Sequence, residues 1–338
     1  MNQKNNSRNL LKNYQSNFSH IYVEREILNH KNTIEILNKF PNSKIIEIEN
    51  YKDVFNRVRQ NFNEQKKSQK LILAEKKFDF VYTGSEFCEN FGESNFYYSS
   101  NILNCFYDCE YCYLKGLYQS SNVVIFVNIE DFFNEVKKVS NNKKIYLCIS
   151  YDSDLLAFEN ITGFVSKWID FAIENPNVLI EIRTKSNNFK SIAYKHIPKN
   201  IIFAWTLSPQ KIIEMYEHRT PSINARLEDI KLAISEGIKI RISIEPIMKI
   251  KEFENVYSDF VQNIFMVIPN DSIRDVNLGV FRMSTDHIKR IHKLNEFSNI
   301  FAYSLERTKG GVSYKDSKYM RDFVYNEVIK FIDKSKVY

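Results

Sequence analysis

The pattern of hydrophobic and polar positions becomes regular from about residue 95. From there, apolar runs rich in β-branched and aromatic residues alternate with stretches of helical periodicity. Strands that alternate with helices are typical of βαβ units and a parallel sheet. The predicted strands are 96–102, 123–127, 144–150, 178–184, 201–207, 238–244, 276–281 and 301–305. The predicted helices are 129–139, 161–174, 222–236, 251–267, 284–295 and 316–332.

This number of repeats indicates an α/β fold with a full or partial (β/α)6 barrel, whose chemistry is expected at the carboxyl ends of the strands. An open, doubly wound sheet is the main alternative. The chain has only 8 glycines and no G-x-G-x-x-G sequence, which argues against a dinucleotide-binding fold.

The first part of the chain follows a different pattern. A predicted helix at 24–40, a strand at 44–48, a helix at 54–67 and a strand at 70–74 indicate a small α/β unit ahead of the barrel. We therefore expect an N-terminal α/β extension at 1–90, a barrel at 91–300, and a C-terminal hairpin and helix at 301–338.

Composition and charge narrow the class of protein. Of 338 residues, 43% are hydrophobic and 26% charged, as in ordinary globular chains. No stretch approaches the roughly 18 apolar residues of a membrane span, and the polar start lacks a secretion signal, so a cytoplasmic protein is expected. The whole chain has a net charge of +6. Residues 1–80 alone account for this charge, since they contain 15 Lys or Arg against 9 Asp or Glu. This excess indicates a polyanionic partner or a solvated surface.

The cysteines carry the clearest chemical signal. There are 5, an odd number that argues against a disulfide framework. Cys105, Cys109 and Cys112 follow a predicted strand with the spacing C-x3-C-x2-C. Three thiolates on one loop can bind three corners of a [4Fe–4S] cluster and leave the fourth iron open. Structural zinc needs four nitrogen or sulfur ligands, and Cys88 or Cys148 could complete such a site only through the fold.

C-x3-C-x-aromatic-C after a barrel strand, with Tyr111 at the aromatic position, resembles the signature of radical S-adenosylmethionine (SAM) enzymes. The resemblance implies that SAM binds the open iron and that a reducing donor of the flavodoxin or ferredoxin type supplies an electron. Cleavage of SAM then gives a 5′-deoxyadenosyl radical. The cofactor carries the difficult chemistry, and the protein holds, orients and shields it.

The chain also resembles the spore photoproduct lyase family over most of its length. The order and spacing of several short segments carry this likeness: residues 45–48, 55–57, 65–74, 109–114, 153–154, 183–185, 205–209, 220–222 and 244–247. Members of the family repair a methylene-bridged thymine dimer formed in DNA by ultraviolet light. The resemblance thus implies DNA as the partner and a carbon–carbon lyase activity.

Matched position by position, the family implies a role for each candidate residue. Cys105, Cys109 and Cys112 would bind the cluster. Tyr111, Ser153, Asp154, Lys185 and Thr206 would contact SAM, and Tyr113 would lie near the path of the radical. Each of these positions lies at the end of a predicted strand or in the loop after it, as a site at the barrel mouth requires.

The sequence departs from the family where the hydrogen-donating cysteine usually stands, because Tyr151 occupies that position. Cys88, in a polar loop ahead of the barrel, is the candidate substitute, and Tyr151 could donate through its phenol or relay to a thiol. Cys148 lies three residues before Tyr151, so strand alternation predicts a core cysteine that faces the outer helices. In the C-terminal hairpin, Arg307, Lys309 and Tyr314 are candidate contacts to DNA, with Gly310 and Gly311 at the turn. The loop at 218–219 could reach the rim of the site or cap the next helix.

Two alternatives to thymine-dimer repair stay open at this point. One is a radical SAM enzyme of the same family that acts on another substrate. The other is a non-catalytic protein that binds zinc and nucleic acid. The sequence does not fix the oligomeric state.

Overall fold

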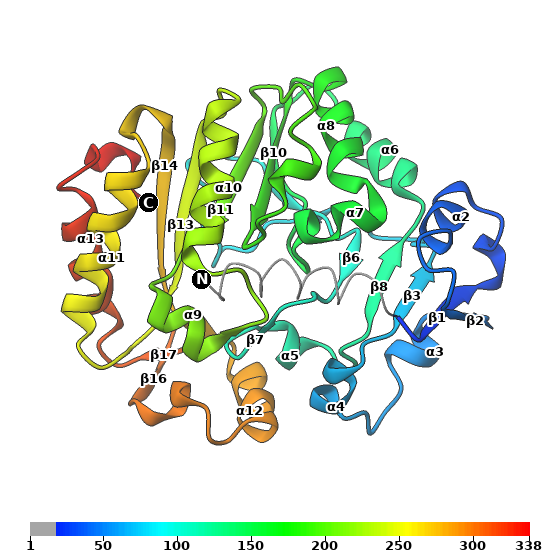
Figure 1. Ribbon diagram of the computed structural model, residues 1–338, viewed down its shortest axis with the longest axis horizontal. Helices are drawn as coiled ribbons and strands as arrows, with labels where there is room; N and C mark the ends of the chain where they lie inside the picture. Colours follow the sequence, from blue (N-terminus) through cyan, green and yellow to red (C-terminus); the bar gives the residue numbers. More distant parts are fainter. Residues whose placement is uncertain (1–17) are drawn as a thin grey trace.

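The computed structural model describes residues 18–338, which are arranged around two main sheets (Figure 1). The larger sheet has the strand order β14-β13-β11-β10-β9-β5-β4. Its strands are β4 (Tyr82–Thr83), β5 (Phe96–Tyr98), β9 (Ile145–Cys148), β10 (Val178–Thr184), β11 (Ile201–Thr206), β13 (Ile240–Ile247) and β14 (Ile273–Val280). All neighbours pair in parallel except β4, which is antiparallel to β5. The edge strands β4 and β14 do not pair with each other within residues 18–338, so the predicted partial α/β barrel is confirmed.

Both faces of this sheet are buried. Side chains alternate between the two faces along each strand, so the faces differ in the residues they carry. On the outer face, Trp205 and Ile242 are fully buried against the helices. On the inner face, the guanidinium of Arg241 forms ion pairs with Glu181 of β10 and Asp275 of β14. The inside of the barrel therefore holds a buried network of charged side chains.

Helices cover the outer face of the barrel (Figure 1). In α6, the buried residues Ile129, Phe132 and Val136 follow the spacing of one helix face. The helices within residues 129–267 are α6 (Ile129–Val139), α7 (Glu159–Thr162), α8 (Phe164–Glu174), α9 (Gln210–Tyr216), α10 (Ile223–Ser235) and α11 (Phe253–Val267), and α13 (Ser317–Val328) comes near the C-terminal end. In the described part of the chain, none of the helices combines the length and hydropathy that a bilayer crossing requires.

The smaller main sheet joins the N-terminal segment to the cysteine loop. Its order is β2-β1-β3-β8-β6, with β1 (His20–Glu24), β2 (Lys44–Ile48), β3 (Leu71–Ala74), β6 (Ile102–Leu103) and β8 (Val123–Phe126). The strand expected at 123–127 thus pairs with β3 in this sheet and not with the barrel strands. The boundary expected after residue 90 does not separate two sheets, because β6 and β8 lie beyond it.

Two of the predicted N-terminal helices are shorter than expected. β1 ends at Glu24, a short 3-10 helix (Arg25–Ile27) takes the first part of the helix expected at 24–40, and α2 (Lys31–Leu37) follows it. The helix expected at 54–67 is divided into α3 (Lys52–Phe55) and α4 (Phe62–Lys67). Arg59, between these two helices, has a φ of 60°, a left-handed conformation that ends a helix.

The C-terminal part adds a small antiparallel sheet of β15 (Arg282–Met283), β17 (Gly311–Tyr314) and β16 (Leu305–Thr308), next to α12 (Thr285–Leu294). β16 and β17 form the expected hairpin, and Lys309 and Gly310 make its turn. Gly311 has a φ of 128°, and a Cβ there would lie 2.1 Å from the carbonyl oxygen of Met283. Only glycine fits this position. The strand expected at 301–305 begins as a 3-10 helix, Asn299–Ala302.

Candidate active site

The cysteine loop lies between β6 and α5 (Leu114–Leu117). Asn104, just before Cys105, has a φ of 68° and turns the chain out of the strand. Within the loop, β7 (Asp108–Cys109) pairs antiparallel with β12 (Glu217–His218), so Cys109 lies opposite Glu217. Cys109 is buried, whereas Cys105 and Cys112 are half-buried. The loop is therefore held on a second strand that comes from far along the chain.

The three thiols of this loop are a donor set that can bind three corners of an iron–sulfur cluster. All three are free, and burial, followed by the charges of Glu217, Cys112 and Cys105, raises the pKa of Cys109 although Lys185 lowers it. Burial raises the pKa of Cys105 to about 12, a shift that a bound cation would reverse. Among residues 18–338, no group of three or more Cys, His, Asp or Glu side chains, these cysteines included, is arranged to hold a metal ion. The loop supplies three sulfur donors, one fewer than the four ligands of a [4Fe–4S] cluster.

The two remaining cysteines contact other partners. The thiol of Cys88 lies 3.1 Å from the phenol oxygen of Tyr151. The thiol of Cys148 lies 3.9 Å from Glu181 Oε1, on the inner face of the barrel. The prediction that Cys148 faces the outer helices was wrong. β9 ends at Cys148, so alternation counted back from Tyr151 does not apply.

Tyr111 is anchored by a buried ion pair. Its hydroxyl donates to Glu217, whose carboxylate also accepts from Ser208 Oγ at 3.1 Å and pairs with Arg226. Although burial opposes its ionisation, Arg226 and then Lys185 hold the pKa of Glu217 below its ordinary value. The ammonium of Lys185 lies 5.5 Å from the centre of the Tyr111 ring. The structure thus brings two predicted SAM contacts, Tyr111 and Lys185, together at one position.

The other residues predicted to contact SAM have protein partners. Ser153 Oγ donates to the carbonyl of Asn104 at 2.7 Å. The carboxylate of Asp154 accepts from Thr184 Oγ1 and from the backbone N–H of Lys185, each at 2.7 Å. Thr206 is buried, and its carbonyl accepts from Arg226 at 2.9 Å. The carboxylate of Asp154 thus fixes the backbone of Lys185.

The predicted donor residues lie together at the same edge of the barrel. Tyr113 donates to the carbonyl of Tyr151 at 2.6 Å and to Asp152 Oδ1 at 2.9 Å. The ring of Tyr151 stacks on Tyr98, with centroids 4.3 Å apart. Burial and the contact with Cys88 raise the pKa of Tyr151, so its phenol keeps its proton at neutral pH.

The C-terminal hairpin presents two of its three candidates for DNA contact. Arg307 and Lys309 are exposed. Tyr314 is fully buried against Phe281 and Tyr303, so the prediction that it touches a base is corrected. Its position in the inner strand β17, and not at the turn, explains the burial.

Sequence reasoning missed three residues that organise this site: Asp152, Glu217 and Lys66. Asp152 accepts from Ser100 Oγ at 2.6 Å in addition to Tyr113. Asp152 directly precedes Ser153 and Asp154, which were predicted to contact SAM, so its position could have identified it as a site residue. Glu217 adjoins the loop at 218–219, where His218 in turn contacts Glu110 of the cysteine loop at 2.7 Å. Lys66 lies in the segment 65–74 that carries part of the resemblance, but nothing there gave it a role, and its partner lies 39 residues away.

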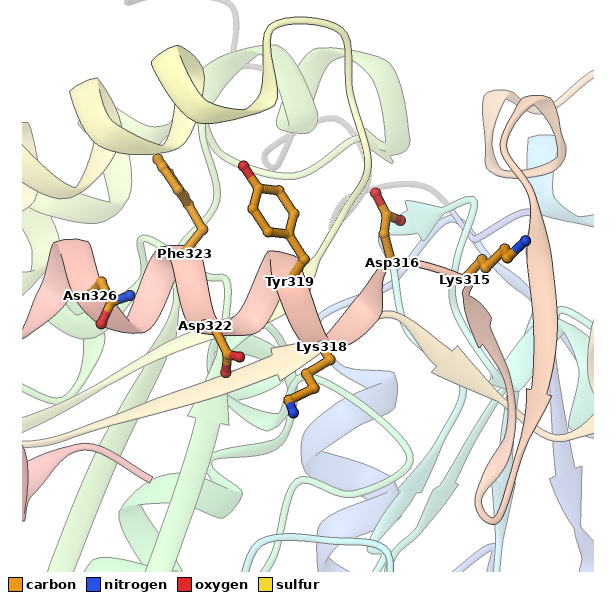
Figure 2. A pocket seen from close by; sticks show the side chains of 7 residues that line it. All are labelled: Lys315, Asp316, Lys318, Tyr319, Asp322, Phe323 and Asn326. Atoms are coloured by element: carbon orange, nitrogen blue, oxygen red, sulfur yellow. The ribbon is translucent and has the colours of Figure 1, made fainter.

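A separate groove of about 520 Å³ lies on α13 (Figure 2). Tyr319 and Phe323 point from α13 toward the neighbouring helix, and the Tyr319 hydroxyl donates to Glu254 of α11 at 2.8 Å. None of the predicted site residues lines this groove, so it is not part of the candidate active site.

The sequence matches the family model described as "Spore photoproduct lyase" over residues 17–331. A relative of that name from Clostridium acetobutylicum is 22% identical over 167 residues, which cover 48% of this chain and 49% of the relative. Another from a Geobacillus species is 22% identical over 183 residues, which cover 53% of each chain. The chain thus spans about half the length of the curated relatives that it matches.

Solved structures are similar over nearly the whole chain. A spore photoproduct lyase with one cysteine changed to alanine and one serine changed to cysteine, with bound AdoMet and dinucleoside spore photoproduct, has a TM-score of 0.81 at 18% identity. The match covers 96% of this chain and 98% of that one. A spore photoproduct lyase complexed with dinucleoside spore photoproduct has a TM-score of 0.80 at 18% identity, over 95% of this chain and 98% of that one. This likeness establishes the fold.

Proposed function

The chain belongs to the spore photoproduct lyase family, and from this premise we propose that it is a radical SAM enzyme that repairs the spore photoproduct in DNA. The single observation that carries the proposal is the contact between Cys88 and Tyr151. It supplies a hydrogen-donating thiol at the position where Tyr151 replaces the usual one. The neighbours whose names and bound molecules are given above support the same substrate class.

Cys105, Cys109 and Cys112 would hold a [4Fe–4S] cluster, and SAM would lie against Tyr111 and Lys185. When bound, the cluster and SAM supply the 5′-deoxyadenosyl radical that takes a hydrogen atom from the lesion. The side chains around this position would exclude water and fix the direction of attack. The Lys185 ammonium pairs well with a carboxylate such as that of SAM. Its backbone is fixed by Asp154, so the ammonium is presented from a rigid strand end.

Cys88 would return a hydrogen atom after the methylene bridge breaks. The S–H bond of Cys88 breaks, a C–H bond forms on the thymine radical, and a thiyl radical is left on sulfur. Tyr151, whose oxygen is 3.1 Å away, would then give its O–H hydrogen atom to the sulfur. The Tyr151 phenoxyl radical returns to the phenol by taking up one electron from the reducing partner and one proton.

The substrate must reach this edge of the barrel. A base within an intact duplex is inaccessible, so we infer that the lesion is extruded, at a cost of a few kcal/mol that damage lowers. Arg307 and Lys309 of the hairpin would contact phosphate. A reducing donor of the flavodoxin or ferredoxin type would serve the cluster. Reduced thiols of this kind point to the cytoplasm.

An anaerobic assay tests the proposal directly. The purified chain, with its iron and sulfide measured, is incubated with SAM, a reductant and oligonucleotide that contains the spore photoproduct. Recovery of thymine is the expected result. Zinc without iron or sulfide would refute the radical chemistry and favour the non-catalytic alternative.

A second candidate is a radical SAM enzyme of this family with another substrate. One observation favours it: Tyr314 is buried, so the hairpin presents only Arg307 and Lys309 to nucleic acid among the three expected contacts. Cleavage of SAM without recovery of thymine in the same assay would support this second candidate.

A further inference from the structure

Lys66 is a lysine of the N-terminal segment whose side chain is buried beside the cysteine loop. It lies in the last turn of α4 and is only 4% exposed. Its ammonium donates to the carbonyl oxygen of Cys105 at 2.6 Å. Gln69 Nε2 donates to the same oxygen at 3.2 Å. One backbone carbonyl of the loop therefore receives a charged donor and a neutral donor.

The surroundings of Lys66 lack an anion to balance its charge. Among residues 18–338, no carboxylate oxygen lies within 4.0 Å of its ammonium. Asp108 of the loop, whose charge acts on Lys66, is itself paired with Lys115 at 2.7 Å. A buried charge is costly unless it is paired, so the position of Lys66 calls for a negative group close by.

A cluster on the three cysteines would provide that group. Three thiolates outweigh the positive charge of the iron–sulfide core, and reduction adds one more negative charge. We propose that Lys66 is a positioning residue that balances the charge of the cluster loop and raises the reduction potential of the cluster. This inference rests on the proposed function, because it requires the cluster on Cys105, Cys109 and Cys112.

The physical basis is that the charge of Lys66 stabilises the reduced state more than the oxidised state. Net charge and hydrogen bonds near a cluster are among the factors that set its potential, and a buried position weakens screening by water. Arg219 Nη1 donates to the carbonyl of Lys66 at 2.8 Å. Arg219 follows β12, the strand paired with the cysteine loop, so helix α4 and the loop are fixed to the same element.

The test compares Lys66→Met, which removes the charge, with Gln69→Leu, which removes the neutral donor to the same oxygen. For each variant, iron and sulfide per chain, the melting temperature, and the midpoint potential by an EPR-monitored reductive titration are measured. At equal cluster content, Lys66→Met is expected to lower the ratio of reduced to oxidised cluster about tenfold at fixed potential, a shift of about 59 mV to more negative values. Gln69→Leu is expected to stay close to the parent.

Lys66→Gln and Lys66→Arg keep the test decisive if Lys66→Met loads no cluster. A neutral variant that binds the cluster at a more negative potential supports the inference. The inference is also supported if Lys66→Arg binds the cluster at the parent potential while both neutral variants bind none. A neutral variant that loads at the parent potential overturns it, and so does an empty Lys66→Arg. If the parent chain itself holds no iron and sulfide, the proposed function fails first, and the two failures are thereby distinguished.

Discussion

The thiol of Cys88 and the phenol of Tyr151 share a contact of 3.1 Å although 63 residues separate them. The loop that carries Cys88 is held by a residue distant in the sequence, because Arg282 donates to the carbonyl of Phe87. Under the proposed function, Cys88 would supply from outside the barrel the hydrogen donor that the barrel strand lacks. The two side chains would then act together in hydrogen transfer.

Replacement of Cys88 is expected to separate SAM cleavage from repair. Cys88→Ala is expected to leave the formation of 5′-deoxyadenosine intact and to lose most of the recovered thymine, because the thymine radical no longer meets a thiol. Product analysis by mass spectrometry measures both. Cys148→Ala is the matched control and should repair normally, since its thiol contacts Glu181. Normal repair by Cys88→Ala would dismiss Cys88 as the donor.

Tyr151→Phe tests the second step of the transfer. This variant keeps the ring that stacks on Tyr98 but lacks the O–H that resets the sulfur. The expected result is a first turnover close to that of the parent and a marked fall in later turnovers, measured by thymine recovered per enzyme over time. Tyr98→Phe keeps the same stack and should cycle normally. Equal multiple turnover in both variants would exclude a relay through Tyr151.

Glu217 is expected to matter for stability, because its ion pair with Arg226 is fully buried. Glu217→Ala leaves the Arg226 charge without its partner, at an expected cost of about 3–5 kcal/mol in the free energy of unfolding. Glu228→Ala removes an exposed pair with Lys231 and should cost no more than about 1 kcal/mol. Denaturant unfolding of the two variants measures the difference. Similar costs for the two would contradict the assignment.

Asp229 gives the chain a pH-dependent stability. Burial raises the pKa of Asp229 from 3.8 to about 7. The folded chain therefore holds this proton more tightly than the unfolded chain, and the stability that the proton contributes is lost as the pH rises from about 4 to about 7. Asp229→Asn does not ionise and can still accept from Phe189 N at 2.7 Å. Melting temperatures across this range should fall less in the variant than in the parent.

An exposed control, Asp271→Asn, should follow the parent at every pH in the same measurement. Parallel curves for Asp229→Asn and the parent would show that Asp229 does not titrate in this range.

The basic residues of the C-terminal hairpin allow a test of DNA as the partner. If Arg307 and Lys309 contact phosphate, changing both to Ala should weaken DNA binding and reduce the slope of log affinity against log salt by about 2. Fluorescence anisotropy with labelled oligonucleotide measures this slope. Lys144 and Lys239 are exposed at the amino ends of β9 and β13, the opposite edge of the barrel, and provide the control pair. An unchanged slope in the hairpin variant would remove it from the interface.

The barrel and the cysteine loop were predictable because their signals are local. The run at 178–184 is a strand from its residues alone, and the spacing of Cys105, Cys109 and Cys112 places three thiols on one loop in any fold. Lys66 and Glu217 were not predictable, because their partners are 39 and 106 residues away. The error at Cys148 came from extending strand alternation past Cys148, where β9 ends. Tyr314 was assigned to the surface because a hairpin sequence does not show which strand faces inward.

The central place of β3 in the smaller sheet has a consequence for how the chain can be shortened. β8, Val123–Phe126, is fully buried and pairs along its length with β3. A fragment that began after residue 90 would expose this apolar strand as a free edge. Such an edge is a template for pairing with other chains. We therefore expect such a fragment to aggregate, and a soluble barrel to require the front segment in the same polypeptide.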